Sequence, residues 1–220
     1  MSYDREGCLL SLDEIAAIMA LSGKQNMIGF QTEEAEGLTR EKLWNACCRL
    51  MADSMMTQID GKFRMSRELV DVMRPACQAR NVLAVTPASD LYPPMILWGA
   101  DTVCAMKATP YGKYILIPVS RGETADVLAE EFDLSWWEID GEKAELPPPI
   151  CVAADAPREQ LLEGCSVLME RLEPNTGIRL DWCRIVGAAA GGWLQWTRND
   201  GLACAPLTRA TLSDVLKIFL

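Results

Sequence analysis

The sequence predicts an α+β fold in which an N-terminal helical module precedes two similar antiparallel meander-plus-helix halves with pseudo-two-fold symmetry. Three observations predict it. Residues 1–80 combine helix-capping residues with apolar residues at helical spacing. From residue 81 the chain changes to short apolar runs separated by tight turns, which is typical of an antiparallel meander. A sequence motif at the end of the first meander, the repeated phrase, recurs eighty-eight residues later, which indicates a duplicated half.

The repeated phrase is a predicted strand-to-helix corner. In each copy a proline ends an apolar run, a Ser or Thr can cap a helix, and an amphipathic segment follows. Capping does not require the Arg and Asp that also recur, so we interpret the repeat as a duplication and divide residues 81–220 into 81–156 and 157–220. The recurring arginines either bind an anion at equivalent positions or pair with nearby carboxylates. The copies are Pro118-Val119-Ser120-Arg121 with Asp126-Val127-Leu128, and Pro206-Leu207-Thr208-Arg209 with Asp214-Val215-Leu216.

The N-terminal module, residues 1–80, is predicted to hold three helices and one hairpin. Ser11 and Glu14 form a capping box that predicts a helix over 12–21. Thr39 caps the next helix, which should end near residue 54. Two short extended runs then flank an Asp60-Gly61 turn, a strong hairpin signal. Ser66 caps a helix through residue 73, where Pro75 should interrupt or kink its continuation.

The remaining elements follow from the apolar runs. In the first half we expect strands over 82–86, 95–98, 102–108 and 113–119 and a helix over 124–132. A connection over 133–157, with three prolines at 147–149, separates the halves. In the second half we expect a helix over 158–172, strands over 178–186, 193–198 and 202–205, and a final helix ending at Phe219.

Composition narrows the possible functions. The chain has no histidine, which excludes Ser-His-Asp and Cys-His catalysis and His-ligated zinc. Its nine cysteines are odd in number, lack a CxxC pair and lie mostly among apolar residues, so we expect reduced thiols in a cytoplasmic protein. No apolar run approaches the roughly 20 residues of a membrane span, and the N-terminus lacks the pattern of a secretory signal. We therefore expect a non-enzymatic protein without a metal, cofactor or membrane partner.

The order helix, helix, hairpin in residues 1–80 resembles a winged-helix module. In DNA-binding members of that class the helix before the hairpin enters the major groove, and the resemblance would place Arg40, Lys42 and Arg49 on that helix and Lys62 and Arg64 on the wing. Residues 38–74 carry seven basic and five acidic side chains, a balance of only +2, and the whole chain carries −10. A nucleic-acid partner is possible, but this charge disfavours it.

Trp136-Trp137 is the stretch most suggestive of a partner contact. Adjacent residues on a strand face opposite ways, so one tryptophan should be exposed unless other elements cover both faces of the strand. Exposed tryptophan is a frequent anchor of protein interfaces. The alternative is that both side chains belong to the core.

Three stretches stand out when the whole order of elements is considered. They are Leu10-Ser11-Leu12-Asp13-Glu14, Arg64-Met65-Ser66-Arg67-Glu68-Leu69, and Trp193-Leu194-Gln195-Trp196-Thr197 through Pro206-Leu207-Thr208. With these stretches, the order of elements resembles the EspG-type chaperones of type VII secretion systems. That resemblance implies a cytosolic protein that needs no cofactor and binds helical secretion partners. This chain is shorter in the connections that help to hold substrates in that family.

Three functions remain open. The first is a non-enzymatic, chaperone-like adaptor that binds helical secreted proteins. The second is a winged-helix transcriptional regulator with a ligand-sensing C-terminal domain. The third is an enzyme that uses thiol or carboxylate chemistry, for which the sequence shows no recognisable cluster of residues.

Overall fold

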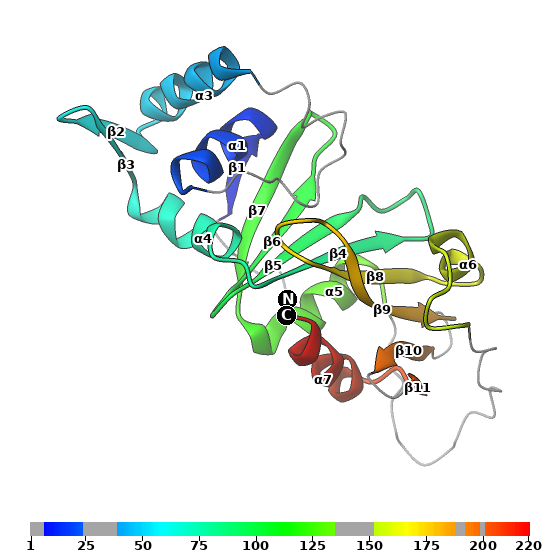
Figure 1. The fold of residues 1–220 in the computed structure, drawn as a ribbon. Coiled ribbons are helices and arrows are strands. Elements are labelled where there is room, and N and C mark those ends of the chain that lie inside the picture. Colours follow the sequence, from blue (N-terminus) through cyan, green and yellow to red (C-terminus); the bar gives the residue numbers. More distant parts are fainter. Residues whose placement is uncertain (1–6, 24–38, 135–151, 188–191, 199–200) are drawn as a thin grey trace.

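A computed structural model describes residues 7–23, 39–134, 152–187, 192–198 and 201–220 (Figure 1). The fold is mixed α and β, in agreement with the predicted α+β class, and helices pack on both faces of a nine-stranded sheet. No helix in the described ranges is long and apolar enough to cross a membrane.

The large sheet is antiparallel at every pairing. Its strand order is β1-β7-β6-β5-β4-β8-β9-β10-β11, so that β4 and β8 pair in the middle, with Val85 opposite Met169. The strands are β1 (Cys8–Ser11), β4 (Asn81–Pro87), β5 (Met95–Gly99), β6 (Val103–Ala108), β7 (Lys113–Val119), β8 (Val167–Leu172), β9 (Arg179–Val186), β10 (Trp193–Arg198) and β11 (Gly201–Pro206).

Alternating side chains divide the sheet between two cores. Leu83 and Leu97 point towards α5 (Thr124–Glu131) and α7 (Arg209–Phe219), which pack on one face. Trp98 belongs to the other core. There the sheet packs against α1 (Leu12–Leu21) and α4 (Arg67–Cys77), α3 (Arg40–Ala52) lies against α1, and the short α6 (Arg158–Leu162) lies near β8 at the far end (Figure 1). The N-terminal helices therefore share a core with the sheet.

Local signals set the ends of the N-terminal elements. Ser11 and Glu14 make the predicted capping box of α1, and Thr39 and Ser66 cap α3 and α4. The hairpin of β2 (Met56–Ile59) and β3 (Lys62–Met65) turns at Asp60 and Gly61, whose φ angles are 51° and 74°. Positive φ at both central residues is the geometry that makes Asp-Gly so favourable in two-residue hairpins.

The structure departs from the prediction at three elements. The helix expected over 158–172 ends at Leu162, and after Gly164, with φ at 64°, the chain continues as β8. These residues form a strand because their buried apolar side chains complete the sheet between β4 and β9. β1 was not predicted, because Leu9 and Leu10 are adjacent apolar residues without alternation and the strand is set by its pairing with β7. α4 continues through Pro75 to Cys77, since a proline in the last turn forfeits only one hydrogen bond.

The two corner phrases differ in local detail. Thr208 caps α7 with a full capping box, whereas the Ser120 side chain bonds the Glu123 carboxylate, and a 3₁₀ turn precedes α5. Arg209 forms a bidentate pair with Asp126, at 2.6 and 2.5 Å, so its carboxylate partner belongs to the other phrase and not, as expected, to its own corner. Arg121 instead donates to the carbonyl oxygens of Ala100 and Leu220.

Candidate functional site

The structure describes one of the two groups of site residues that were predicted from the sequence. Trp136 and Trp137 lie outside the described residues. The five basic residues proposed for DNA contact lie on α3 and on β3, and all five are exposed. They are Arg40, Lys42 and Arg49 on the helix and Lys62 and Arg64 on the hairpin.

Arg49 is already engaged within the protein. Its Nε donates to Glu14 Oε1 at 3.0 Å, and its Nη2 lies 3.7 Å from Asp13 Oδ2. The other carboxylate oxygen of Glu14 accepts the Ser11 backbone N–H at 2.8 Å. Burial acts to raise the pKa of Glu14, but the hydrogen bonds from Ser11 and Arg49 outweigh it and hold that pKa below its ordinary value. Arg49 therefore fastens α3 to α1 rather than standing free for a phosphate.

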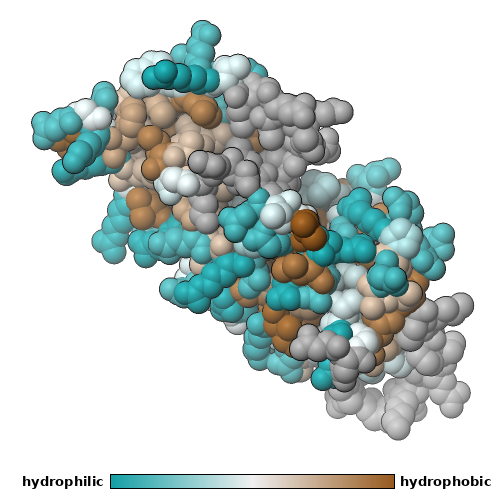
Figure 2. Space-filling model, viewed as in Figure 1, coloured by the Kyte–Doolittle hydropathy of each residue, from teal (hydrophilic) through white to brown (hydrophobic). Residues whose placement is uncertain are grey.

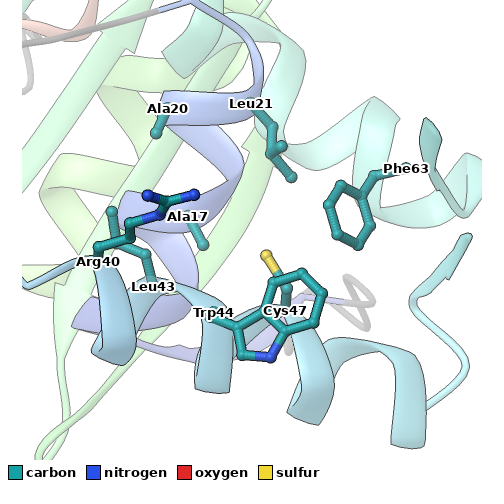
Figure 3. Close-up of a pocket in the computed structure, with 8 residues that line it drawn as sticks. All are labelled: Ala17, Ala20, Leu21, Arg40, Leu43, Trp44, Cys47 and Phe63. Carbon is teal, nitrogen blue, oxygen red and sulfur yellow. The ribbon is translucent and has the colours of Figure 1, made fainter. Parts of the chain in front are cut away.

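A groove of about 400 Å³ lies between α1, α3 and the hairpin, and we call it the α1–α3 groove (Figure 3). Figure 2 shows apolar surface over these helices, beside the hydrophilic hairpin. All but one of the described residues that line the groove are apolar or thiol-bearing. They are Ala17, Ala20, Leu21, Arg40, Leu43, Trp44, Cys47 and Phe63.

Helical spacing builds both walls of the groove. Ala17 lies three and four positions before Ala20 and Leu21 on α1, so the three side chains share one face. The second wall follows the same spacing on α3, at positions 40, 43, 44 and 47. Small side chains on α1 opposite large ones on α3 leave the space between the helices open.

Trp44 is the most prominent apolar side chain of the groove. It is 52% exposed although it lies on a wall of apolar residues. Its ring meets the edge of Phe63 from β3, with 6.1 Å between centroids and 66° between planes. This contact orients the indole at the hairpin end of the groove while leaving half of its surface available.

The described side chains of the groove offer apolar contacts and one guanidinium group. Burial raises the pKa of the Cys47 thiol, which keeps it protonated near neutral pH and makes it a weak nucleophile. Within the described ranges, no group of three or more Cys, Asp or Glu side chains could hold a metal ion. What remains is an apolar surface with a guanidinium group at its rim, a combination suited to binding.

A second polar cluster lies under α6 and connects it to the sheet. Buried Glu170 accepts from Arg158 at 2.8 Å, and Arg179 Nη1 lies 3.5 Å from its other oxygen. Buried Arg184 donates to Gln195 Oε1 at 2.7 Å and to backbone carbonyls of the α6 segment. Because these groups satisfy one another in the interior, we assign the cluster to the stability of this end of the sheet.

Sequence reasoning missed the α1–α3 groove. It requires α1 and α3 to lie side by side, and residues 24–38 separate them in the chain. One signal could have indicated it. The apolar residues expected to face the core on α3 are Leu43, Ala46, Cys47, Leu50 and Met51. Trp44 is not among them, and a tryptophan beside such a stripe is a candidate for exposure.

Comparison with known proteins gives a likeness in structure alone. No protein-family model matches the sequence, and no curated protein sequence matches it. The solved structure of the Mycobacterium tuberculosis type VII secretion system chaperone EspG5, in complex with the PE25–PPE41 dimer, is similar with a TM-score of 0.51. The likeness covers 97% of this chain and 95% of that chain at 9% sequence identity. The chain is thus similar in fold to a secretion chaperone that was solved bound to a protein dimer.

Proposed function

We propose that this chain is a non-enzymatic, cytoplasmic protein-binding protein, a chaperone-like adaptor for helical secreted substrates. The α1–α3 groove, with the half-exposed Trp44 at its hairpin end, carries the proposal. A half-exposed tryptophan beside a hollow is the typical anchor of a protein interface. The similarity in fold to EspG5, a chaperone solved with a protein dimer, supports the same role.

The non-enzymatic part of the proposal rests on the available chemistry. The sequence has no histidine to act as a general base. Burial raises the pKa of the Cys165 thiol to about 11 and also raises the pKa values of the Cys104 and Cys183 thiols. Thiols that stay protonated near neutral pH make poor nucleophiles.

We also propose that the sheet consists of two related halves with pseudo-two-fold symmetry, preceded by a winged-helix-like module over 1–80. Four strands and a helix occur in the order β4-β5-β6-β7-α5 and again as β8-β9-β10-β11-α7. The antiparallel β4–β8 pair at the centre and the Asp126–Arg209 pair between the two phrases support this. On this view, 81–156 and 157–220 are the repeated units.

The alternative, a winged-helix transcriptional regulator with a ligand-sensing C-terminal domain, is supported by the sequence of α3 and hairpin with exposed Arg40, Lys42, Lys62 and Arg64. The ion pairs of Arg49 with Glu14 and Asp13 weaken it, since they occupy a predicted phosphate contact. The net charge of −10 weakens it further.

Capture from native host extract tests the two functions together. The purified chain and two variants, Trp44→Ala and Tyr111→Ala, are used as baits, and the bound material is identified by mass spectrometry and DNA sequencing. Tyr111 is the matched control because it is an aromatic side chain that is 91% exposed and lies outside the groove.

The chaperone-like function predicts one pattern of capture. A helical secreted protein should be recovered by the wild type and by Tyr111→Ala but not by Trp44→Ala. Recovery of a specific DNA sequence at moderate salt, lost when Lys62 and Arg64 are both changed to Glu, would establish the regulator instead. A partner held equally by all three baits would remove the groove from the proposal.

A further inference from the structure

The form of the α1–α3 groove indicates the shape of its occupant. The stripe on α3 extends from Arg40 to Cys47, which is about 10 Å along a helix, and α1 forms the opposite wall. Phe63 of β3 adds an aromatic side chain to the lining (Figure 3). A third helix fits between two helix faces, because its ridges of side chains can enter the grooves between theirs.

Arg40 gives the groove a charge preference. It is the one charged side chain among the described residues that line the groove, and its guanidinium group extends towards α1 (Figure 3). Among the described residues, no hydrogen bond or ion pair engages its side chain, whereas Arg49 on the same helix is paired with Glu14 and Asp13. Two arginines of one helix thus have different roles: Arg49 joins α3 to α1, and Arg40 is available at the rim.

Covering the groove would change the environment of Arg40. In the free protein Arg40 is exposed, so water solvates its charge. An occupant that excludes water without offering an anion would leave a desolvated cation, which is strongly unfavourable. A carboxylate satisfies a guanidinium group with two parallel hydrogen bonds, and a protein partner can supply one from Asp or Glu.

We propose that the α1–α3 groove binds an amphipathic helix of a partner protein whose apolar stripe ends in a carboxylate that pairs with Arg40. This inference rests on the proposed protein-binding function and specifies the chemistry of its partner. Trp44 and Phe63 receive the apolar stripe, and Arg40 fixes the direction in which the helix lies. An apolar lining also favours such a helix over a nucleic acid, whose backbone would bring several phosphates to one cation.

The test is a charge-swap selection with displayed helical peptides. The library has apolar residues at positions i, i+3, i+4 and i+7, and the position one turn before the stripe varies among Glu, Gln and Lys. It is selected on the full chain, on Arg40→Glu, on Trp44→Ala and on Lys42→Glu. Lys42→Glu is the matched control, because it changes the charge of α3 equally at an exposed position outside the groove.

The expected result is a reversal of charge preference at one position. Selection on the wild type and on Lys42→Glu should enrich peptides with Glu at the varied position. Selection on Arg40→Glu should enrich peptides with Lys there, and selection on Trp44→Ala should enrich neither kind of peptide. In titrations followed by tryptophan fluorescence, Arg40→Glu should weaken the Glu peptide by about tenfold or more, because it removes a charge-assisted hydrogen bond. The peptide with Lys should bind Arg40→Glu about as tightly as the peptide with Glu binds the wild type. Circular dichroism should show equal melting temperatures for the wild type and both charge variants.

Other outcomes overturn the inference and identify which part failed. Equal charge preference on the wild type and Arg40→Glu would overturn the carboxylate pairing while leaving a protein-binding groove. If Lys42→Glu also reversed the charge preference of the selected peptides, that preference would come from the total charge of α3 and not from Arg40. Peptides that bind Trp44→Ala as well as the wild type would place the helix elsewhere. Self-association of the wild type that Trp44→Ala removes would identify a second copy as the occupant. The proposed function fails separately, if host capture recovers no protein partner.

Discussion

Replacing Glu14 with Gln should loosen the contact between α1 and α3 without changing the shape of the side chain. Glu14 is 6% exposed, and its two oxygens accept from the Ser11 backbone at 2.8 Å and from Arg49 Nε at 3.0 Å. Gln can keep one acceptor but loses the charge that strengthens both bonds. Because α1 and α3 form the walls of the α1–α3 groove, the same change should affect its width.

The magnitude follows from the exposure of the two partners. Hydrogen bonds to charged groups contribute about 1.5–3 kcal/mol each. The Arg49 side chain is 47% exposed, so solvent screens its half of the pair and reduces the contribution. We expect Glu14→Gln to lower the free energy of unfolding by about 1–2 kcal/mol. A double-mutant cycle with Arg49→Met should give a coupling of about 1 kcal/mol.

The sign of the pH dependence follows from the direction of the pKa shift. The folded protein holds the pKa of Glu14 below its ordinary value of 4.5. A carboxyl group with a lowered folded pKa stabilises the protein above its unfolded pKa, and this contribution is lost as the pH falls through the folded pKa. The difference between the wild type and Glu14→Gln should therefore be complete at neutral pH and shrink below 4.5.

Urea denaturation of the wild type and variants at neutral and acidic pH measures both effects. Asp13→Asn is the matched control, because its contact with Arg49 is 3.7 Å long and Asp13 is 31% exposed. This control should cost less than about 0.5 kcal/mol. A coupling below about 0.3 kcal/mol, within the error of additivity, would refute the assignment of Glu14 and Arg49 as the connection between α1 and α3. So would a loss that does not change with pH.

Three further outcomes are expected. Thiol titration of the denatured protein without reductant should find all nine cysteines reduced, in line with the eight free ones the structure describes, and seven or fewer would contradict this. Arg209→Ala should lower the free energy of unfolding by only about 0.5–1 kcal/mol, because Arg209, paired with Asp126, is 63% exposed; a denaturation midpoint equal to that of the wild type would count against the pair. Replacing whichever of Trp136 and Trp137 is exposed with Ala should weaken a captured partner by about 2 kcal/mol or more with little change in melting temperature. If both variants unfold and neither weakens binding, the pair belongs to the core.

Elements with strong local signals were predictable from the sequence. The Ser11–Glu14 capping box, the Asp60-Gly61 turn and the strands bounded by Pro or Gly all fell within a residue or two of the observed limits. β8 was not predictable in this way, because its residues alternate poorly and also suit a helix. The pairing of β8 with β4 and β9 makes this segment a strand, and that pairing depends on how the whole sheet is assembled.

The candidate site was less predictable than the fold. Sequence reasoning could place Arg40 and Arg49 on one helix, but their different surroundings depend on where α1 lies. A net basic count over residues 38–74 treats the two as equal contributors to a DNA-binding surface. In the structure Glu14 neutralises one of them and an apolar groove adjoins the other.

The difference between the two arginines also separates the competing functions. A DNA-reading helix needs several free cations aligned towards phosphates, because each neutralised phosphate adds to affinity. Here Arg49 is engaged by α1, and Arg40 lies beside Trp44 and Leu43 rather than on a polar surface. A guanidinium group at the rim of an apolar groove suits an amphipathic partner with one acid far better than a polyanion. If Arg40→Glu and Arg49→Met weaken a captured partner equally, this distinction is wrong; if Arg40→Glu acts on binding and Arg49→Met on stability, the adaptor function follows and the regulator does not.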